Sequence, residues 1–333
     1  MIRNLSMTKH LNRRTFVKVA LAGIGSSGLN SFRGATAAVV TKPTYATIID
    51  THTHFYDPSR PQGVPWPSKN DKVLYRTVLP KDYRALPKPQ SVTGTVVVEA
   101  SSWVEDNQWI LDLAASDPFI VGFVGNLPVG TDEFRGHLKR FTANPLFRGL
   151  RIGGSRLREG LEQDHFVRDL RLVAASDLAV DLLGGPEILQ DVTRLAKAIP
   201  ELRLIIDHVA NVKIDGKQPN AAWREGMQTA SQSKNVFCKV SGLVEGTGRS
   251  DGTAPRDPEF YQPILDVVWA AFGEDRLVYG SNWPVSERFA SCATVQAIVS
   301  EYFGSKRKPA AEKYFWQNAR VVYKWIKRGP SPD

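Results

Sequence analysis

Short β-branched runs alternate eight times with amphipathic stretches along this chain, and this repetition limits its possible folds more than any other feature. The predicted strands are residues 47–54, 94–100, 120–127, 147–152, 179–184, 203–208, 236–242 and 276–281. Helices are predicted near 106–116, 131–142, 165–176, 187–198, 220–233, 259–272, 291–303 and 309–327. Alternating strands and helices form parallel βαβ units. Eight such units in this length predict an α/β fold, a single closed (β/α)8 TIM barrel.

A long connection interrupts the alternation after the first strand. Residues 55–93 are rich in proline and aromatic side chains and stand outside the regular spacing. Loops that follow the strands of such a barrel lie at its mouth, where long ones can act as lids. No Gly-x-Gly-x-x-Gly follows the first strand, which argues against a dinucleotide-binding fold. We therefore expect residues 55–93 to cover the barrel mouth.

The beginning of the chain has the pattern of an export signal. Residues 12–18, Asn-Arg-Arg-Thr-Phe-Val-Lys, match the bacterial twin-arginine signal, and residues 19–29 are weakly apolar and too short to span a membrane. Residues 35–37, Ala-Thr-Ala, supply a cleavage site of small residues. We expect a signal peptide at 1–37, a barrel domain at 38–333, and a periplasmic protein whose precursor binds the twin-arginine export machinery.

Charge and composition exclude several classes of protein. The formal net charge of +9 includes six basic residues of the leader, which has no acidic residue, so the remaining chain carries only +3. We see no basic helix face and therefore expect no nucleic-acid partner. Two cysteines cannot form a disulfide framework, and after the leader no apolar run approaches the roughly 18 residues of a membrane span. A small-molecule substrate is the partner that we expect.

Polar side chains stand at the carboxyl ends of the predicted strands, where (β/α)8 barrels carry their active sites. His52 and His54 end the first strand and, being two residues apart, point to the same face. Such a pair can bind one metal ion, flank one substrate carbonyl, or simply be hydrogen-bonded. Other strands supply Glu99, Arg151, Asp181, His208, Lys239 and Asn282. Titratable groups converging on one mouth are what a hydrolytic site needs.

Substrate-binding candidates follow from the chemistry of the same region. Arg151 has a forked guanidinium that suits a carboxylate or hydroxyl groups, and Lys239 is a second cationic candidate. Either can equally be satisfied within a polar layer of the barrel, with Asp181 as partner. Asp207 is interpreted as orienting a backbone segment or a helix cap. The mouth loops also carry three tryptophans that suit the apolar faces of a sugar-like ring, or serve ordinary packing: Trp66, Trp103 and Trp283.

Four motifs, in the right order, resemble those of the amidohydrolase superfamily. They are Ile-Asp-Thr-His-Thr-His at 49–54, Ile-Asp-His at 206–208, Lys-Val-Ser-Gly-Leu at 239–243 and Tyr-Gly-Ser-Asn-Trp-Pro-Val at 279–285. The resemblance spans about residues 47–325 and is greatest to the amidohydrolase-2 type branch. That branch includes sugar-acid lactonases and 2-pyrone-4,6-dicarboxylate lactonase. The motifs are specific for the family and weak for the substrate.

The resemblance implies roles for the strand-end residues. His52 and His54 would bind one divalent metal ion, zinc or manganese, or would polarise the lactone carbonyl where no metal is held. His208 would bind metal or assist proton transfer. Hydrolytic relatives have an aspartate as base on the last strand, whereas this chain has Asn282, and a carboxamide cannot take a proton from water. Glu99 or His208 could replace that base, or Asn282 could hold a water that His208 activates.

The expected function is therefore the opening of a cyclic ester, a sugar-acid or related lactone, by attack of water at the barrel mouth. One alternative is a metal-dependent decarboxylase of the same superfamily. Its usual histidine on the fifth strand is missing here, since residues 180–183 read Val-Asp-Leu-Leu. Another alternative is a non-catalytic periplasmic ligand-binding barrel, which Asn282 in place of the base would explain.

Overall fold

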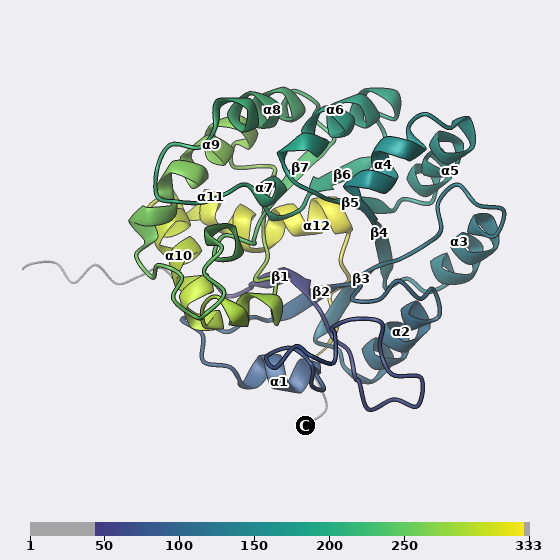
Figure 1. Cartoon of the computed structure of the whole chain (residues 1–333), viewed down its shortest axis with the longest axis horizontal. Helices are drawn as coiled ribbons and strands as arrows, with labels where there is room; N and C mark the ends of the chain where they lie inside the picture. Colours follow the sequence, from purple (N-terminus) through teal and green to yellow (C-terminus); the bar gives the residue numbers. More distant parts are fainter. Residues whose placement is uncertain (1–43, 330–333) are drawn as a thin grey trace, which may run out of the picture. The chain divides into compact units, whose positions relative to one another are not determined.

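The computed structural model describes residues 44–329, and its centre is a ring of eight parallel strands (Figure 1). The strands are β1 Ile49–Thr53, β2 Gly94–Val98, β3 Ile120–Gly125, β4 Phe147–Gly153, β5 Ala179–Leu183, β6 Arg203–Ile206, β7 Val236–Val240 and β8 Leu277–Tyr279. Each strand pairs with the next in sequence. β1 and β8 meet where Thr53 bridges to Trp283, and the backbone N–H of His54 donates to the Trp283 carbonyl (2.9 Å). The predicted (β/α)8 barrel is confirmed.

Helices surround the strands, as Figure 1 shows. They are α1 Pro80–Ala85, α2 Asp106–Ser116, α3 Phe134–Thr142, α4 Gly154–Gly160, α5 Asp164–Ala175, α6 Leu189–Ala198, α7 His208–Asn211, α8 Ala221–Ser231, α9 Gln262–Phe272, α10 Cys292–Gly304, α11 Lys308–Glu312 and α12 Asn318–Tyr323. The helix predicted at 309–327 is divided, because a π-helical turn, Lys313–Gln317, separates α11 from α12. It also ends early, since Lys324 adopts a left-handed conformation (φ 50°). α1, α4 and α7 are short and have no clear sequence period.

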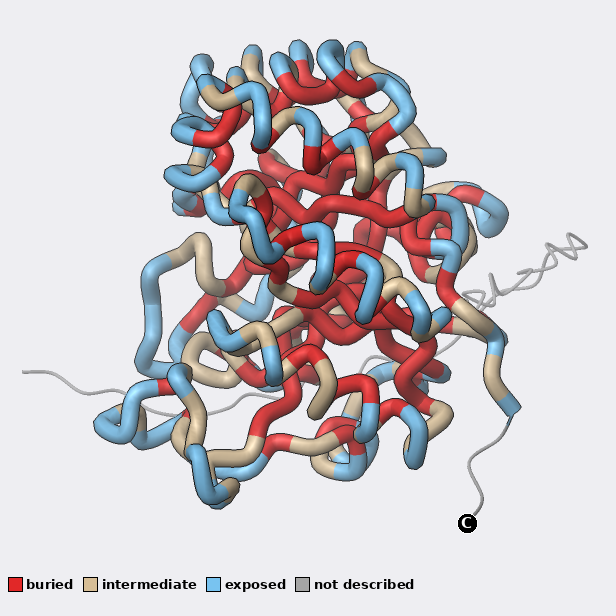
Figure 2. Tube along the Cα trace, turned by 90° about the vertical axis from the view of Figure 1, so that its right-hand side faces the viewer, coloured by how far each residue is buried: buried red, intermediate tan, exposed pale blue. Residues whose placement is uncertain are grey.

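Most strands are buried on both faces, because one face lines the barrel and the other meets the helices. Val96 and Val98 belong to the cluster inside the barrel, whereas Val97 packs in the outer layer. The C-terminal segment closes the inner cluster with Tyr323 and Trp325. Figure 2 shows the buried chain at the centre and exposed residues along the outer turns. No helix among residues 44–329 is long and apolar enough to cross a membrane.

The long connection between β1 and β2 is fastened to the barrel at several points. Arg60 forms two hydrogen bonds with the carboxylate of Asp106 at the start of α2 (2.9 and 3.1 Å). Tyr56 and Val78 pair as an isolated antiparallel bridge, so the segment between them, residues 57–77, begins and ends at the same place. This attachment holds residues 57–77 beside the carboxyl ends of the strands, where the sequence predicted a mouth-covering loop.

Asp50 joins β1, β8 and α1 below the barrel mouth. Its carboxylate accepts hydrogen bonds from the backbone N–H groups of His52 (3.0 Å) and Ser281 (2.9 Å). The Tyr83 hydroxyl on α1 donates to the other oxygen (2.6 Å). The β1–β2 register shifts between Asp50 and Thr53, so Asp50 faces outward while His52 and His54 turn into the barrel. Asp50 is thus a structural group that fixes the strand carrying both histidines.

Candidate active site

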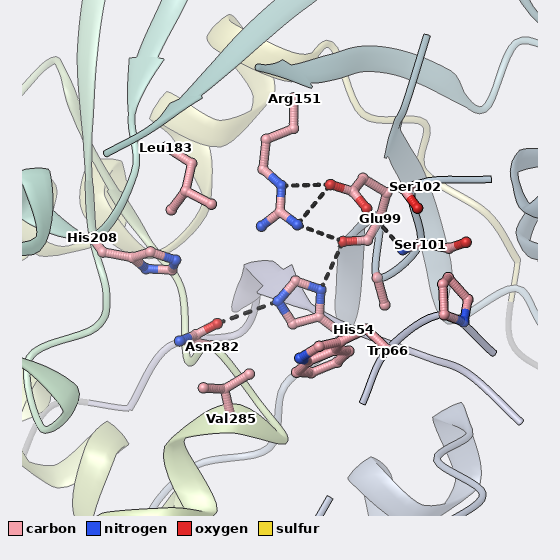
Figure 3. Close-up of a pocket in the computed structure, with 12 residues that line it drawn as sticks. His54, Trp66, Glu99, Ser101, Ser102, Arg151, Leu183, His208, Asn282 and Val285 are labelled. Carbon is pink, nitrogen blue, oxygen red and sulfur yellow. Dashed lines mark hydrogen bonds and ion pairs between the residues drawn. The ribbon is translucent and has the colours of Figure 1, made fainter. Parts of the chain in front are cut away.

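A pocket of about 370 Å³ lies at the carboxyl ends of the strands (Figure 3). Most of the residues predicted for the site line it: His54, Trp66, Glu99, Arg151, His208 and Asn282. Pro65 of the long β1–β2 connection also belongs to the wall. Leu183 at the end of β5 lines it as well, so the pocket is formed by six strand ends and the mouth loop, and it is large enough for a single sugar-sized ring.

Three imidazoles meet at the pocket and its floor, each anchored through Nδ1. His54 Nδ1 lies 2.9 Å from the Val98 carbonyl, and only the protonated nitrogen can donate there. His208 Nδ1 lies 2.8 Å from Ser241 Oγ. His52 is fully buried below the other two, with ring centroids 4.4 Å from His208 and 4.9 Å from His54. Anchoring Nδ1 fixes the rings of His54 and His208 and leaves their Nε2 lone pairs for a ligand.

These histidines are neutral at ordinary pH. Burial, with a contribution from the Arg151 guanidinium, lowers the pKa of His54 from 6.5 to about 3. Burial also lowers the pKa of His208 to about 4, and nearby Lys239 works in the same direction. Burial lowers the pKa of His52 well below its usual value. Neutral rings keep one lone pair each, which is what a general base or a metal ligand requires.

Lys239 lies beneath the pocket and holds a buried charge network together. Its ammonium contacts Asp181 Oδ2 (2.6 Å), Asp207 Oδ1 (3.0 Å) and His52 Nδ1 (3.1 Å). The Tyr323 hydroxyl donates to the other Asp181 oxygen (2.7 Å). Lys239 is fully buried and all its donors are occupied, so the structure does not present it to a substrate. Its position is that of a support for His52.

Glu99 and Arg151 form one ion-paired unit on the pocket wall. Arg151 Nε donates to Glu99 Oε1 (2.8 Å), and Arg151 Nη2 lies 2.7 Å from the same oxygen and 2.9 Å from the Glu99 carbonyl. The remaining Glu99 oxygen accepts from the Ser101 N–H (2.8 Å). Glu99 was predicted as a catalytic residue, but both of its oxygens are engaged. Its carboxylate orients Arg151, which faces the pocket (Figure 3).

Asn282 is held by a residue that the sequence analysis did not identify. Its Nδ2 donates to Glu245 Oε1 (2.9 Å), and its Oδ1 lies 3.3 Å from His54 Nε2. Asn282 has a left-handed backbone (φ 56°), which asparagine tolerates better than most residues. Burial raises the pKa of Glu245 from 4.5 to about 7. Glu245 follows β7 in a loop without periodicity, so no sequence pattern could reveal the contact.

His208 lies in an unusual backbone segment. The strand predicted at 203–208 ends at Ile206, and residues 208–211 all have positive φ, between 43° and 57°. Left-handed conformations of this kind are strained for residues with a Cβ and are found at functional sites. The Trp223 indole N–H donates to the Val209 carbonyl (2.9 Å), and Gly242 lies against the His208 ring. These contacts turn the imidazole toward the pocket.

The three tryptophans predicted to bind substrate lie in different environments. Trp66 lines the pocket beside His54, with ring centroids 6.0 Å apart. Trp103 is 40% exposed and lies outside the pocket lining. Trp283 is fully buried, donates to Glu287 Oε1 (2.7 Å) and packs against Tyr83. Only Trp66 therefore offers a ring to a ligand in this pocket, because Trp283 points into the core on the opposite side of the strand end.

A group of metal-ligating atoms comes from His52, Asp207 and His208, with one donor atom of each within 4.8 Å of the others. Among residues 44–329, His52 Nε2 and Asp207 Oδ2 are buried without a hydrogen-bond partner, and Asp207 Oδ1 is ion-paired with the Lys239 ammonium (3.0 Å). Lys239 lowers the pKa of Asp207 well below its usual value despite burial, so this carboxylate is charged. Two imidazoles and a carboxylate fit a divalent ion. Asp207, interpreted from sequence as an orienting group, thus joins His52 and His208.

Comparison with known proteins identifies the family of this chain. The family model described as "Amidohydrolase" matches residues 49–325. A relative named L-fucono-1,5-lactonase, from Burkholderia ambifaria, is 31% identical over 72% of this chain and 80% of its own length. Another of that name, from Burkholderia multivorans, is 26% identical over 80% and 92%. A zinc-bound amidohydrolase structure from Burkholderia multivorans superimposes with a TM-score of 0.73 at 24% identity, covering 84% of this chain and all of that one. The chain belongs to the amidohydrolase family.

Proposed function

We propose that this enzyme hydrolyses a cyclic ester, with the 1,5-lactone of a sugar acid as the first substrate class to test. The observation that carries the proposal is the meeting of neutral imidazoles with the Arg151–Glu99 pair around one pocket. The relatives named L-fucono-1,5-lactonase support the substrate class. Trp66 offers a ring face for the carbon skeleton, and Arg151 a cation for hydroxyl or carboxylate oxygens.

Ring opening requires a water to lose a proton while its oxygen bonds to the carbonyl carbon. In the tautomer whose Nδ1 donates to Ser241, His208 has an acceptor Nε2 and is the residue that we assign as base. The bond between the carbonyl carbon and the ring oxygen then breaks. The proton passes from His208 to that oxygen, so the product is a hydroxy acid, which releases its own acidic proton to solvent.

We also propose that His52, Asp207 and His208 can hold one divalent ion, zinc or manganese. With the ion bound, His208 would give its Nε2 lone pair to the ion instead of to the water proton, and His54 Nε2 would be the acceptor left at the pocket. The buried, unpartnered donor atoms of His52 and Asp207 support this in the described part of the chain. Such an ion would supply Lewis acidity for the lactone carbonyl. The Lys239 ammonium donates to His52 Nδ1 (3.1 Å), which puts the ring proton on Nε2. Binding an ion at Nε2 would require that proton to move to Nδ1, where Asp207 Oδ1 (3.6 Å) would face it in place of Lys239. The ion's identity can be determined by elemental analysis of the purified protein.

The test is a pH-indicator screen of aldonolactones and pyrone lactones with and without chelator. We expect acid release that the chelator lowers and zinc or manganese restores. His208→Gln should reduce kcat at least ~100-fold, because a positioned base contributes about 10²–10⁴-fold. His165→Gln is the matched control, since His165 is exposed and outside the pocket. Carbon dioxide release from aromatic acids without lactone opening would instead favour a decarboxylase, and ligand binding without turnover a binding protein.

We propose in addition that the protein is exported to the periplasm by the twin-arginine route. The support is the pattern of residues 12–18 and the cleavage motif at 35–37, which lie outside the described residues. Replacing both arginines by lysine, R13K/R14K, should leave the full-length precursor in the cytoplasm. Cell fractionation with an antibody against the barrel measures this, and equal periplasmic amounts of both forms would contradict it.

A further inference from the structure

Asn282 and Glu245 form a pair in which the chemistry of one partner fixes the orientation of the other. In its ionised form Glu245 only accepts hydrogen bonds, so above its pKa the Asn282 amide must turn its Nδ2 toward Glu245, 2.9 Å away. The Asn282 oxygen then points to the other side, where His54 Nε2 lies at 3.3 Å (Figure 3). The contact with Glu245 therefore determines that the oxygen of Asn282, and not its nitrogen, faces the pocket.

The atom that faces Asn282 Oδ1 is also an acceptor. His54 uses its Nδ1 proton on the carbonyls of Val98 (2.9 Å) and Glu99 (3.1 Å), so its Nε2 carries a lone pair. Two acceptors therefore stand side by side on the pocket wall, and neither can satisfy the other. A molecule with two O–H hydrogens, or one hydroxyl shared between them, would satisfy both.

Glu245 has little other function in the fold. Glu245 is half-buried as a whole, but its Oε2 is buried and has no hydrogen-bond partner among residues 44–329. Its loop is fixed independently of the carboxylate, because the Gly246 carbonyl accepts from Ile214 (2.8 Å) and the Gly246 N–H donates to Gly242 (3.0 Å). Burying a carboxyl group lowers the stability of the fold unless the group is hydrogen-bonded. Asn282 is the only described side-chain partner of Glu245, so that contact best explains why the group is there.

We propose that Glu245 is a positioning residue that carries the negative charge of this site and, through Asn282, fixes a pair of acceptors for the O–H groups of the attacking water. The pair consists of Asn282 Oδ1 and His54 Nε2. In this arrangement the carboxylate lies in the loop after β7 and acts on the pocket through the amide of Asn282. The role toward the attacking water rests on the proposed hydrolytic function, whereas the contact between Glu245 and Asn282 does not.

The pair can be tested by moving the charge from one partner to the other. Glu245→Gln leaves an amide that offers either oxygen or nitrogen, so the orientation of Asn282 is no longer fixed, and kcat should fall about 10-fold. Asn282→Asp brings two carboxyl groups to hydrogen-bond distance, and kcat should fall about 100-fold. In E245Q/N282D the new amide can donate to the new carboxylate. We expect this double variant to recover to within about 10-fold of the parent.

The control is Glu259→Gln, which removes the charge of an exposed glutamate in the same region and should leave kcat unchanged. A loss in kcat with KM constant identifies water as the bound donor, whereas a rise in KM identifies a substrate hydroxyl. Additive effects of the two substitutions on kcat would overturn the positioning role, because independent residues do not rescue each other.

Thermal unfolding of the same four proteins separates this inference from the proposed function. We expect Asn282→Asp to lower Tm and the double variant to regain most of the loss, whether or not any lactone is opened. Non-additive Tm values in a protein without lactonase activity would refute the proposed function and retain the pair. Additive Tm values would refute the pair itself, whatever the activity.

Discussion

Replacing Gly242 by alanine should damage the site by pushing on His208. Gly242 follows Ser241 at the end of β7 and has a positive φ of 66°. A Cβ placed there would lie 2.6 Å from His208 Cβ and 2.9 Å from its Cγ, well inside van der Waals contact. His208 cannot withdraw easily, because its own backbone is left-handed and the Trp223 indole holds the next residue.

The size of the effect follows from two contributions. A positive φ costs a residue with a Cβ roughly 1–2 kcal/mol, of which the loss of unfolded-state freedom returns about 0.4–1 kcal/mol. Forcing an extra methyl group into a filled site costs about 1–3 kcal/mol more. We therefore expect Gly242→Ala to lower the free energy of unfolding by about 2–4 kcal/mol. A displacement of the imidazole by ~1 Å should also lower kcat about 100-fold.

Gly248→Ala is the matched control. Gly248 has nearly the same φ, 69°, but a Cβ there would meet no described atom within 4 Å. This variant should show the backbone contribution alone, about 1 kcal/mol, and normal kcat. Urea unfolding measures both free energies, and lactone hydrolysis measures kcat. If Gly242→Ala matched Gly248→Ala in both measurements, the steric argument for His208 would be wrong.

Two further predictions concern buried charges. Burial raises the pKa of Glu245 from 4.5 to about 7, so the unfolded chain binds fewer protons than the folded one between these values. The wild type should therefore lose up to about 3 kcal/mol of stability relative to Glu245→Gln as pH rises from 4.5 to 7, and a constant difference in urea unfolding would contradict this. Lys239→Met should cost about 3–5 kcal/mol, because Asp181 and Asp207 then lack a counter-ion; an unchanged urea midpoint would refute the network.

The sequence predicted the barrel because its signal is repeated eight times, and a local error at one boundary does not disturb the period. The sequence could not show which way Trp283 points, because this residue follows the end of β8. Asn282 lines the pocket while Trp283 packs against Tyr83, and the left-handed backbone of Asn282 (φ 56°) sets their directions beyond the end of β8. Glu245 could not be predicted, since its contact with Asn282 depends on how one loop folds against the end of another strand.

Depth along the strands explains why residues that share a face have different roles. Side chains two positions apart face the same way but lie about 6.6 Å apart along the strand. Ala179, Asp181 and Leu183 on β5, and Phe237, Lys239 and Ser241 on and after β7, form three successive layers: apolar floor, charged network and pocket level. His52 belongs to the charged layer with Lys239, whereas His54 belongs to the pocket with Asn282. The two histidines of the His-x-His motif are therefore not equivalent: His52 contacts the buried charges, and His54 lines the pocket.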